Sequence, residues 1–232
     1  MTVVNDAVIV AAGLGSRMLP TSAYLPKESL PLVDVPAFIH LIREAVNAGV
    51  VRIHIITSPT KDFSTFLESK EHYHLLKPEI SSSLFSVDEA IKFFIHIQHE
   101  PLGLGHAILQ SLDEVQGAYL VLLGDNIITD NFSSVRDFTA SNASRKLVSA
   151  FNRTGLPCAG VYSVPDSEVS NYGVIELEGQ KISQIVEKPD IDDAPSNKVL
   201  CGRYVFTIDS KNLLLEKYPV NVFGEFQTIE LQ

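Results

Sequence analysis

Short apolar runs alternate with amphipathic stretches along the first half of the chain. Four runs have the length and apolar content of β-strands: residues 7–12, 51–57, 92–98 and 118–123. The first and last of them, AVIVAA and AYLVLL, are apolar without interruption, which is typical of strands buried on both faces of a parallel sheet. The periodicity predicts helices between the strands, over residues 36–48, 60–68 and 104–115. The alternation predicts an α/β fold with a mixed, mostly parallel central sheet flanked by helices.

The second half of the chain has a different pattern, in which strands follow one another closely. After a predicted helix over residues 133–141, strands are expected at residues 159–164, 173–177, 182–187 and 200–207, and a last helix at residues 209–217. Residues 69–91 are polar without a clear period, so we expect a loop with a short helix there. Neither half contains a repeat, a linker or a low-complexity tract. The sequence therefore predicts a single domain over residues 1–232.

The composition limits the classes of partner. The 232 residues carry a formal net charge of −10, which argues against a nucleic-acid surface and against an anionic membrane. No apolar run approaches the ~20 residues of a membrane span, and no basic segment precedes the first apolar run as in a secretory signal. Cys158 and Cys201 lack metal-ligand spacing and are expected to be buried free thiols in a reducing cytoplasm. An acidic protein must bind a polyphosphate through local groups, namely backbone N–H groups, single cations and a divalent metal ion.

The segment after the first strand is a candidate for such a site. Gly13 and Gly15 let the backbone approach a phosphate closely, and open α/β sheets bind ligands at the carboxyl ends of their strands. The third glycine of the dinucleotide fingerprint and the Gly-Lys-Ser/Thr of the P-loop are both missing here. Arg17 and Lys27 supply two cations for a phosphate. The alternative is an ordinary glycine turn with solvated cations.

Other chemistry-bearing side chains follow predicted strands. Asp125 comes after the fourth strand, where its carboxylate could hold Mg²⁺ or close a turn. Gln98 ends the third strand, and its amide could pair with the edge of a pyrimidine or be an ordinary strand-end residue. Glu187 and Lys188 could bind sugar hydroxyls and a phosphate, or form an ion pair across strands. The residue types alone leave these alternatives open.

Several of these motifs together resemble a known family. Residues 11–27 (AAGLGSRMLPTSAYLPK) resemble the nucleotide loop of the sugar-1-phosphate nucleotidyltransferases, and residues 28–36 (ESLPLVDVP) look like the branch with the bacterial UTP–glucose-1-phosphate uridylyltransferases, or UDP-glucose pyrophosphorylases. Further similarities follow in the same order along the chain: GLGHA at 103–107, LGDN at 123–126, YGV at 172–174, VEKP at 186–189 and APSNKVLCGRYVF at 194–206. The resemblance implies a Rossmann-like nucleotide-diphospho-sugar transferase fold, with a nucleotide-binding half at residues 1–132 and a sugar-binding half at residues 133–232.

The resemblance also assigns roles to individual residues. It implies catalytic roles for Arg17, Lys27 and Asp125, with Asp125 as a ligand of a Mg²⁺ cofactor. The nucleotide would be bound by the phosphate loop and by two residues at the base: Ala11, Ala12, Gly13, Leu14, Gly15, Ser16, Gln98 and Gly103. The sugar phosphate would be bound by Gly173, Glu187, Lys188 and Gly202. Family members supply a second metal-binding aspartate beyond the segment that matches residues 224–230, and the C-terminus is short relative to the family because the sequence given ends at Gln232.

The implied reaction transfers a uridylyl group from UTP to glucose-1-phosphate and yields UDP-glucose and pyrophosphate. Two alternatives stay open. One is a related nucleotidyltransferase that uses dTTP or another sugar-1-phosphate, because uracil and thymine present the same pairing edge. The other is a non-catalytic relative that binds a nucleotide sugar. The expected partners are the two substrates, with no nucleic acid and no membrane, and the resemblance implies a cytoplasmic homodimer or homotetramer.

Overall fold

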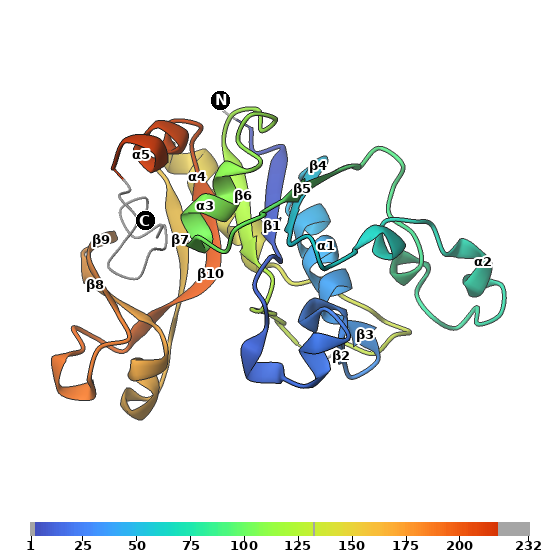
Figure 1. Cartoon of the computed structure of the whole chain (residues 1–232), viewed down its shortest axis with the longest axis horizontal. Helices are drawn as coiled ribbons and strands as arrows, with labels where there is room; N and C mark the ends of the chain where they lie inside the picture. The colour runs from blue at the N-terminus through green and yellow to red at the C-terminus, as the bar shows by residue number, and fades with distance from the viewer. Residues whose placement is uncertain (1–2, 132, 218–232) are drawn as a thin grey trace.

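A single mixed sheet forms the centre of the molecule (Figure 1). The computed structural model describes residues 3–131 and 133–217. Eight strands join in the order β5-β4-β1-β6-β10-β8-β9, with β7 paired to β10. Their bounds are β1 (Asp6–Val10), β4 (Arg52–Thr57), β5 (Lys92–Ile97), β6 (Tyr119–Leu123), β7 (Cys158–Ser163), β8 (Gly173–Glu178), β9 (Lys181–Glu187) and β10 (Lys198–Phe206).

The two halves of the chain contribute different kinds of pairing to this sheet. The four strands of the first half run parallel to one another. The strands of the second half pair antiparallel, and β10 joins β6 of the first half in an antiparallel ladder. The mixed sheet of the predicted fold is therefore confirmed, and its parallel part is the part built by the alternating strands and helices.

Helices cover both faces of the sheet. The face that carries Ala7 and Ile9 of β1 packs against α1 (Ala37–Asn47) and α4 (Ala143–Thr154). The face that carries Val8 packs against α3 (Gly103–Leu109) and α5 (Ser210–Lys217). Successive side chains of a strand point to opposite faces, so the uninterrupted apolar run of β1 supplies both cores at once.

The helix predicted over residues 133–141 is wrong, and the helix of this region is α4, which the prediction missed. Ser134 Oγ accepts hydrogen bonds from the N–H groups of Arg136 and Asp137, at 3.2 and 3.3 Å, so the side chain competes with helical bonding there. The helix that does form buries Val148 and Phe151 on one stripe and ends at Gly155, whose φ is +68°.

Smaller differences concern the connecting segments. Residues 60–68 contain a 3₁₀ turn, Ser64–Phe66, in place of the expected helix, and the helix expected over 104–115 ends at Leu109. The polar region 69–91 holds the short α2 (Glu71–His74) and a 3₁₀ turn, as expected. The proline-rich segment after the glycine loop forms three 3₁₀ turns and the short pair β2 (Pro31–Leu32) and β3 (Val35–Pro36).

The composition predicted buried cysteines and no membrane-spanning segment. Cys158 and Cys201 are free thiols, and both are half-buried where burial was expected. Among the described residues, no helix has the length and apolar character to cross a membrane.

Candidate active site

The carbonyl groups of the glycine loop are held by a lysine that the sequence analysis did not single out. Lys61 follows β4, and its Nζ donates to the carbonyl oxygens of Ala11, at 2.8 Å, and Gly13, at 2.6 Å. The same Nζ lies 3.1 and 3.3 Å from the two carboxylate oxygens of Glu28. Burial raises the pKa of the Glu28 carboxyl, and the charge of Lys61 partly offsets that effect. Lys61 therefore neutralises a buried carboxylate and fixes the orientation of the loop.

The N–H groups of the same loop are left for another partner. Ala11 N–H donates to Ile56 O at 2.8 Å, but residues 12–15 donate no backbone hydrogen bond within the part of the chain that the structure describes. Gly15 has φ +69°, a left-handed conformation, and its carbonyl accepts from the Ser22 hydroxyl at 2.8 Å. With the carbonyls of residues 11, 13 and 15 engaged and the N–H groups of residues 12–15 unengaged, the loop is suited to bind an anion.

The exposure of the loop residues agrees with this arrangement. Ala11 and Ala12 are buried beneath the sheet edge, Gly15 is half-buried, and Gly13, Leu14 and Ser16 are exposed. The donors of residues 13 and 14 therefore lie at the surface, where a phosphate could reach them.

Asp125 lies at the same sheet edge, as predicted. β6 runs parallel to β1 beside it, and Gly124 comes so close to Val10 that a Cβ on this glycine would lie 2.6 Å from the Val10 carbonyl oxygen. The next side chain, Asp125, accepts a hydrogen bond from Lys27 Nζ at 2.8 Å. The stem of Lys27 passes Gly15, where an added Cβ would lie 3.3 Å from Lys27 Cδ. The structure thus brings the loop, Lys27 and Asp125 together.

The charges around Asp125 keep its carboxyl ionised. Burial raises the pKa of Asp125, but the hydrogen bond and charge of Lys27 and the charge of Arg17 outweigh it, so the pKa lies below its usual value. Arg17 is exposed at the end of the loop, and its charge lowers the pKa of Asp125 less than Lys27 does. The centre is a carboxylate paired with Lys27, with a smaller electrostatic contribution from Arg17.

Gln98 and Gly103, the predicted base contacts, lie next to each other. Gln98 follows β5, its side chain is buried, and its Nε2 donates to Gly103 O at 3.1 Å. The same Nε2 lies 3.0 Å from Nδ1 of His106 in α3. In this orientation the amide nitrogen is engaged within the protein, and Oε1 is the atom suited to accept a hydrogen bond from a base N–H. The roles of both residues stay a prediction.

A cavity of about 880 Å³ opens beside Asp125 toward the second half of the chain. Its lining includes Asp125, Asn126, Lys146, Tyr172, Cys201 and Arg203. Its volume falls in the range of small-molecule sites, and its charged lining residues are two cations, Lys146 and Arg203, and two carboxylates, Asp125 and Asp130. Sequence reasoning missed both cations, Lys146 because its helix α4 was not predicted.

None of the four predicted sugar contacts is among the described residues that line this cavity, although Gly173 and Gly202 directly follow or separate lining residues. Gly173 pairs with Glu187 across β8 and β9, and a Cβ on Gly173 would lie 3.0 Å from Glu187 Oε2. Lys188 forms an exposed pair with Glu187 at 3.8 Å and donates its N–H to the carbonyl of Tyr172, a residue of the cavity lining. Gly202 has φ +70° and approaches the Asp125 segment, where an added Cβ would lie 3.1 Å from Leu123 Cβ.

A buried ion pair connects the two halves beside the cavity. Arg203 of β10 donates through Nε and Nη2 to the two carboxylate oxygens of Glu44, both at 2.8 Å. Nη2 also donates to the carbonyl of Asn126 at 2.7 Å. The residues of this pair are 159 positions apart, and no local signal in the sequence joins them.

The residues at Asp125 are suited to a hard cation but supply few ligands by themselves. Mg²⁺ prefers carboxylate oxygens and is commonly held by one or two carboxylates together with substrate phosphates, which agrees with a single Asp125 beside an anion-binding loop. Within residues 3–131 and 133–217, three candidate metal ligands come together elsewhere, at His54, His96 and Glu114. Residues 224–230, which the resemblance connects with a second ligand, lie outside the described residues.

The fold and this edge of the sheet define a nucleotidyltransferase. The model of the Nucleotidyl transferase family matches residues 6–220, so the chain belongs to this family, as the sequence motifs predicted. UTP–glucose-1-phosphate uridylyltransferases of Haemophilus influenzae and Bacillus subtilis are 36% and 35% identical to it. The alignments cover 95% and 98% of this chain and 79% and 78% of those proteins.

Solved structures show the same similarity. A UDP-glucose pyrophosphorylase complexed with UDP-glucose superimposes with a TM-score of 0.82 at 30% identity, over 98% of this chain and 85% of that one. A UTP-bound enzyme of the same kind from Acinetobacter baumannii gives a TM-score of 0.80 at 30% identity, over 94% and 79% of the two chains. The predicted fold class is confirmed by these neighbours.

Proposed function

We propose that this chain transfers the uridylyl group of UTP to glucose-1-phosphate and releases pyrophosphate and UDP-glucose. The observation that carries the proposal is one edge of the sheet, where a loop with unengaged N–H groups lies beside the Lys27–Asp125 pair. The names of the similar proteins, and the UTP and UDP-glucose in the titles of similar structures, support these substrates.

The nucleotide binds along the edge formed by β1, β5 and β6 in this proposal. The N–H groups of residues 13–16 and the guanidinium of Arg17 hold the β- and γ-phosphates, because backbone donors and a bidentate cation suit phosphate oxygens. The base lies against Gly103, and Gln98 Oε1 accepts from its N–H. Lys61 keeps the loop carbonyls turned away from the phosphates, since its Nζ already binds two of them.

The reaction needs alignment and charge neutralisation. A phosphate oxygen of glucose-1-phosphate, already ionised at neutral pH, attacks the α-phosphorus of UTP. The bond from that phosphorus to the bridging oxygen of the β-phosphate breaks, and pyrophosphate leaves with the bonding electrons. Lys27 neutralises the charge that builds up at the α-phosphate, and Arg17 that on the leaving group. No covalent enzyme intermediate is required.

Mg²⁺ completes the proposed centre, with Asp125 as its protein ligand. When bound, such an ion supplies charge neutralisation for phosphate oxygens. Lys27 would then release Asp125, whose side chain is 56% exposed, and turn its ammonium to the substrate.

The sugar phosphate binds between the cavity beside Asp125 and the ends of β8 and β9 that carry Gly173 and Glu187. Lys188 binds its phosphate and Glu187 accepts from sugar hydroxyls, with Gly173 and Gly202 giving the sugar access to the backbone. Lys146, whose side chain is exposed, is a further cation in the lining of this cavity. We further propose that both halves form one domain, which the ladder between β6 and β10 supports. The two free thiols suit a cytoplasmic location, and a homodimer or homotetramer stays a prediction.

A substrate matrix tests the proposed function. Pyrophosphate release is measured with UTP, dTTP, ATP and CTP, each against glucose-1-phosphate, galactose-1-phosphate and N-acetylglucosamine-1-phosphate in the presence of Mg²⁺. The proposal predicts the highest kcat/KM for UTP with glucose-1-phosphate, and loss of turnover in excess EDTA. A preference for dTTP or another sugar would reassign the substrates, and UTP binding without any turnover would contradict the proposed activity.

A further inference from the structure

A second set of polar side chains lies apart from the glycine loop and Asp125. His54 is on β4, where it pairs with Val8 in the middle of β1, and His96 is on the neighbouring strand β5. Glu114 lies between α3 and β6. The strand register puts both imidazoles on the face of the sheet that α3 covers. The proposed transfer reaction uses none of these three side chains.

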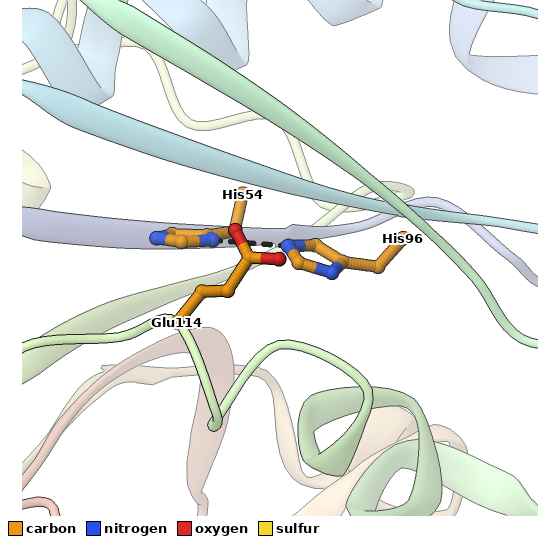
Figure 2. Close-up of side chains that lie close together, drawn as sticks. All are labelled: His54, His96 and Glu114. Atoms are coloured by element: carbon orange, nitrogen blue, oxygen red, sulfur yellow. Dashed lines mark hydrogen bonds between the residues drawn. The ribbon is translucent and has the colours of Figure 1, made fainter.

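The three side chains converge on one point (Figure 2). His54 Nδ1 and His96 Nε2 face each other at 3.0 Å, and one ligand atom from each of the three residues lies within 4.8 Å of the others. Figure 2 shows the Glu114 carboxylate beside the two facing nitrogens. In a tetrahedral zinc site, bond lengths of about 2.0–2.1 Å place two nitrogen ligands about 3.3 Å apart. The imidazoles are already close to that spacing. Glu114 is exposed, so its side chain can move closer to the two nitrogens and bring its carboxylate to ligand distance of the same ion.

A buried carboxylate orients the first imidazole. Asp6 Oδ1 lies 2.9 Å from His54 Nε2 and, because a carboxylate accepts, that nitrogen carries the proton of the neutral ring. The lone pair of Nδ1 therefore faces His96. Arg52 holds both sides of the cluster, since it donates to Asp6 at 2.8 Å and to the carbonyl of Glu114 at 3.0 Å. A carboxylate that binds the far nitrogen of a histidine is the usual support of a metal-bound imidazole.

The charge balance of the cluster leaves room for a cation. Asp6 is fully buried, and its Oδ2 has no hydrogen-bond partner within residues 3–131 and 133–217. Asp6 and Glu114 bring two carboxylates to a region where Arg52 is the cation in contact with both segments. A divalent ion between the imidazoles would replace their direct nitrogen–nitrogen contact and compensate the second carboxylate.

We propose that His54, His96 and Glu114 bind one transition-metal ion of the Zn²⁺ class, with water in the fourth position. Two imidazole nitrogens and one carboxylate are a donor set that suits Zn²⁺ and Co²⁺, whereas Mg²⁺ selects oxygen ligands. The ion enters from the side of Glu114 and half-buried His96, because His54 is fully buried.

The ion acts as a structural clip on the edge of the sheet. Within the described part of the sheet, β5 is the last strand on this side and pairs with β4 alone, and the ion ties both strands to the segment before β6. Gln98 directly follows β5, so the clip also stabilises the strand that carries the proposed base contact. The site itself does not rest on the proposed reaction.

Metal binding to the full chain tests this proposal without an activity assay. Protein stripped with a chelator and dialysed is titrated with Zn²⁺ by calorimetry and with Co²⁺ by visible absorption, which is intense in tetrahedral sites. We expect one strong Zn²⁺ site per chain, a tetrahedral Co²⁺ spectrum and a higher Tm with Zn²⁺. Glu114→Gln and His96→Gln should each weaken Zn²⁺ binding at least about tenfold. Loss of a residue that only hydrogen-bonds to a metal ligand already lowers affinity by that much, and loss of the ligand itself should lower it no less.

The controls separate this site from adventitious binding by other histidines. Glu89→Gln makes the same change at an exposed carboxylate outside the cluster and should leave the Zn²⁺ affinity unchanged. Far-ultraviolet circular dichroism of each variant reports whether it is folded. Unchanged Zn²⁺ affinity in the folded Glu114→Gln and His96→Gln proteins, or an octahedral Co²⁺ spectrum, would overturn the proposal and leave the cluster as a hydrogen-bonded network.

Discussion

Two ion pairs with equal hydrogen-bond lengths have very different surroundings. Lys27–Asp125 and Glu44–Arg203 both have nitrogen–oxygen distances of 2.8 Å. The side chains of the first pair are 14% and 56% exposed, and those of the second are 1–2% exposed. Glu44 and Arg203 are also bound by other groups, since Glu44 accepts from the Ser144 hydroxyl at 2.5 Å.

The difference shows which pair can take part in chemistry. A pair that is open to solvent contributes about 0–1 kcal/mol to stability, and its members can exchange each other for a phosphate or a metal ion. A buried pair cannot open without leaving a charge in a medium of low dielectric constant. Bond length alone does not distinguish the two, whereas exposure and the number of additional partners do.

Breaking the buried pair should have the largest effect on stability. Glu44→Gln removes the charge opposite Arg203 and leaves a buried guanidinium uncompensated, so the free energy of unfolding should fall by about 3–5 kcal/mol. Urea denaturation measures this change. Glu68→Gln, at an exposed pair with Lys70, is the matched control and should change stability by less than about 0.5 kcal/mol. Equal stability of the two variants would show that the buried pair is not structural.

Lys61→Met should have an intermediate effect, because Lys61 is nearly buried but contacts the exposed loop. The variant removes the nearer ammonium from Glu28 and leaves Lys27 at 3.9 Å, so the free energy of unfolding should fall by about 1–3 kcal/mol. The loop carbonyls also lose their donor, so KM for UTP should rise. Lys70→Met is the control for a surface lysine. A folded Lys61→Met protein with normal KM would refute the role of Lys61 in orienting the loop.

The pH dependence of the exposed pair should give the smallest effect. The folded-state pKa of Asp125 lies below its ordinary value of 3.8, so the pair is fully formed above that pH and is lost as the pH falls through the lowered pKa. Carbon-13 NMR of the Asp125 carboxyl as a function of pH measures this pKa. Lys27→Met removes the main stabilising charge and should raise the pKa of Asp125. An identical titration in both proteins would exclude a contact between Lys27 and Asp125 in solution.

The parts of the fold that could be predicted are those with local signals. The apolar runs of β1 and β6 predicted their burial, and Gly13 and Gly124 marked the sheet edge where the loop and Asp125 meet. The helix predicted over residues 133–141 failed because Ser134 binds its own backbone, a competition that apolar periodicity does not show.

The parts of the site that could not be predicted depend on distant residues. Lys61 lies 50 positions from Ala11 in the sequence, and Glu44 lies 159 positions from Arg203. Such contacts arise from the packing order of the strands, so only the folded structure reveals them. The resemblance supplied the order of motifs, but it did not indicate which cations would line the cavity.

The central claim, that Lys27 acts in the reaction, is tested most directly by the kcat of Lys27→Met. Pyrophosphate release is measured with saturating UTP and glucose-1-phosphate, and the free energy of unfolding of the same protein is measured in parallel. Removing a group that stabilises charge in the transition state typically lowers kcat by about 10²–10³. We expect a loss of that size with a stability change below about 1 kcal/mol, because the pair with Asp125 is open to solvent. Turnover close to that of the unmodified chain would contradict the account.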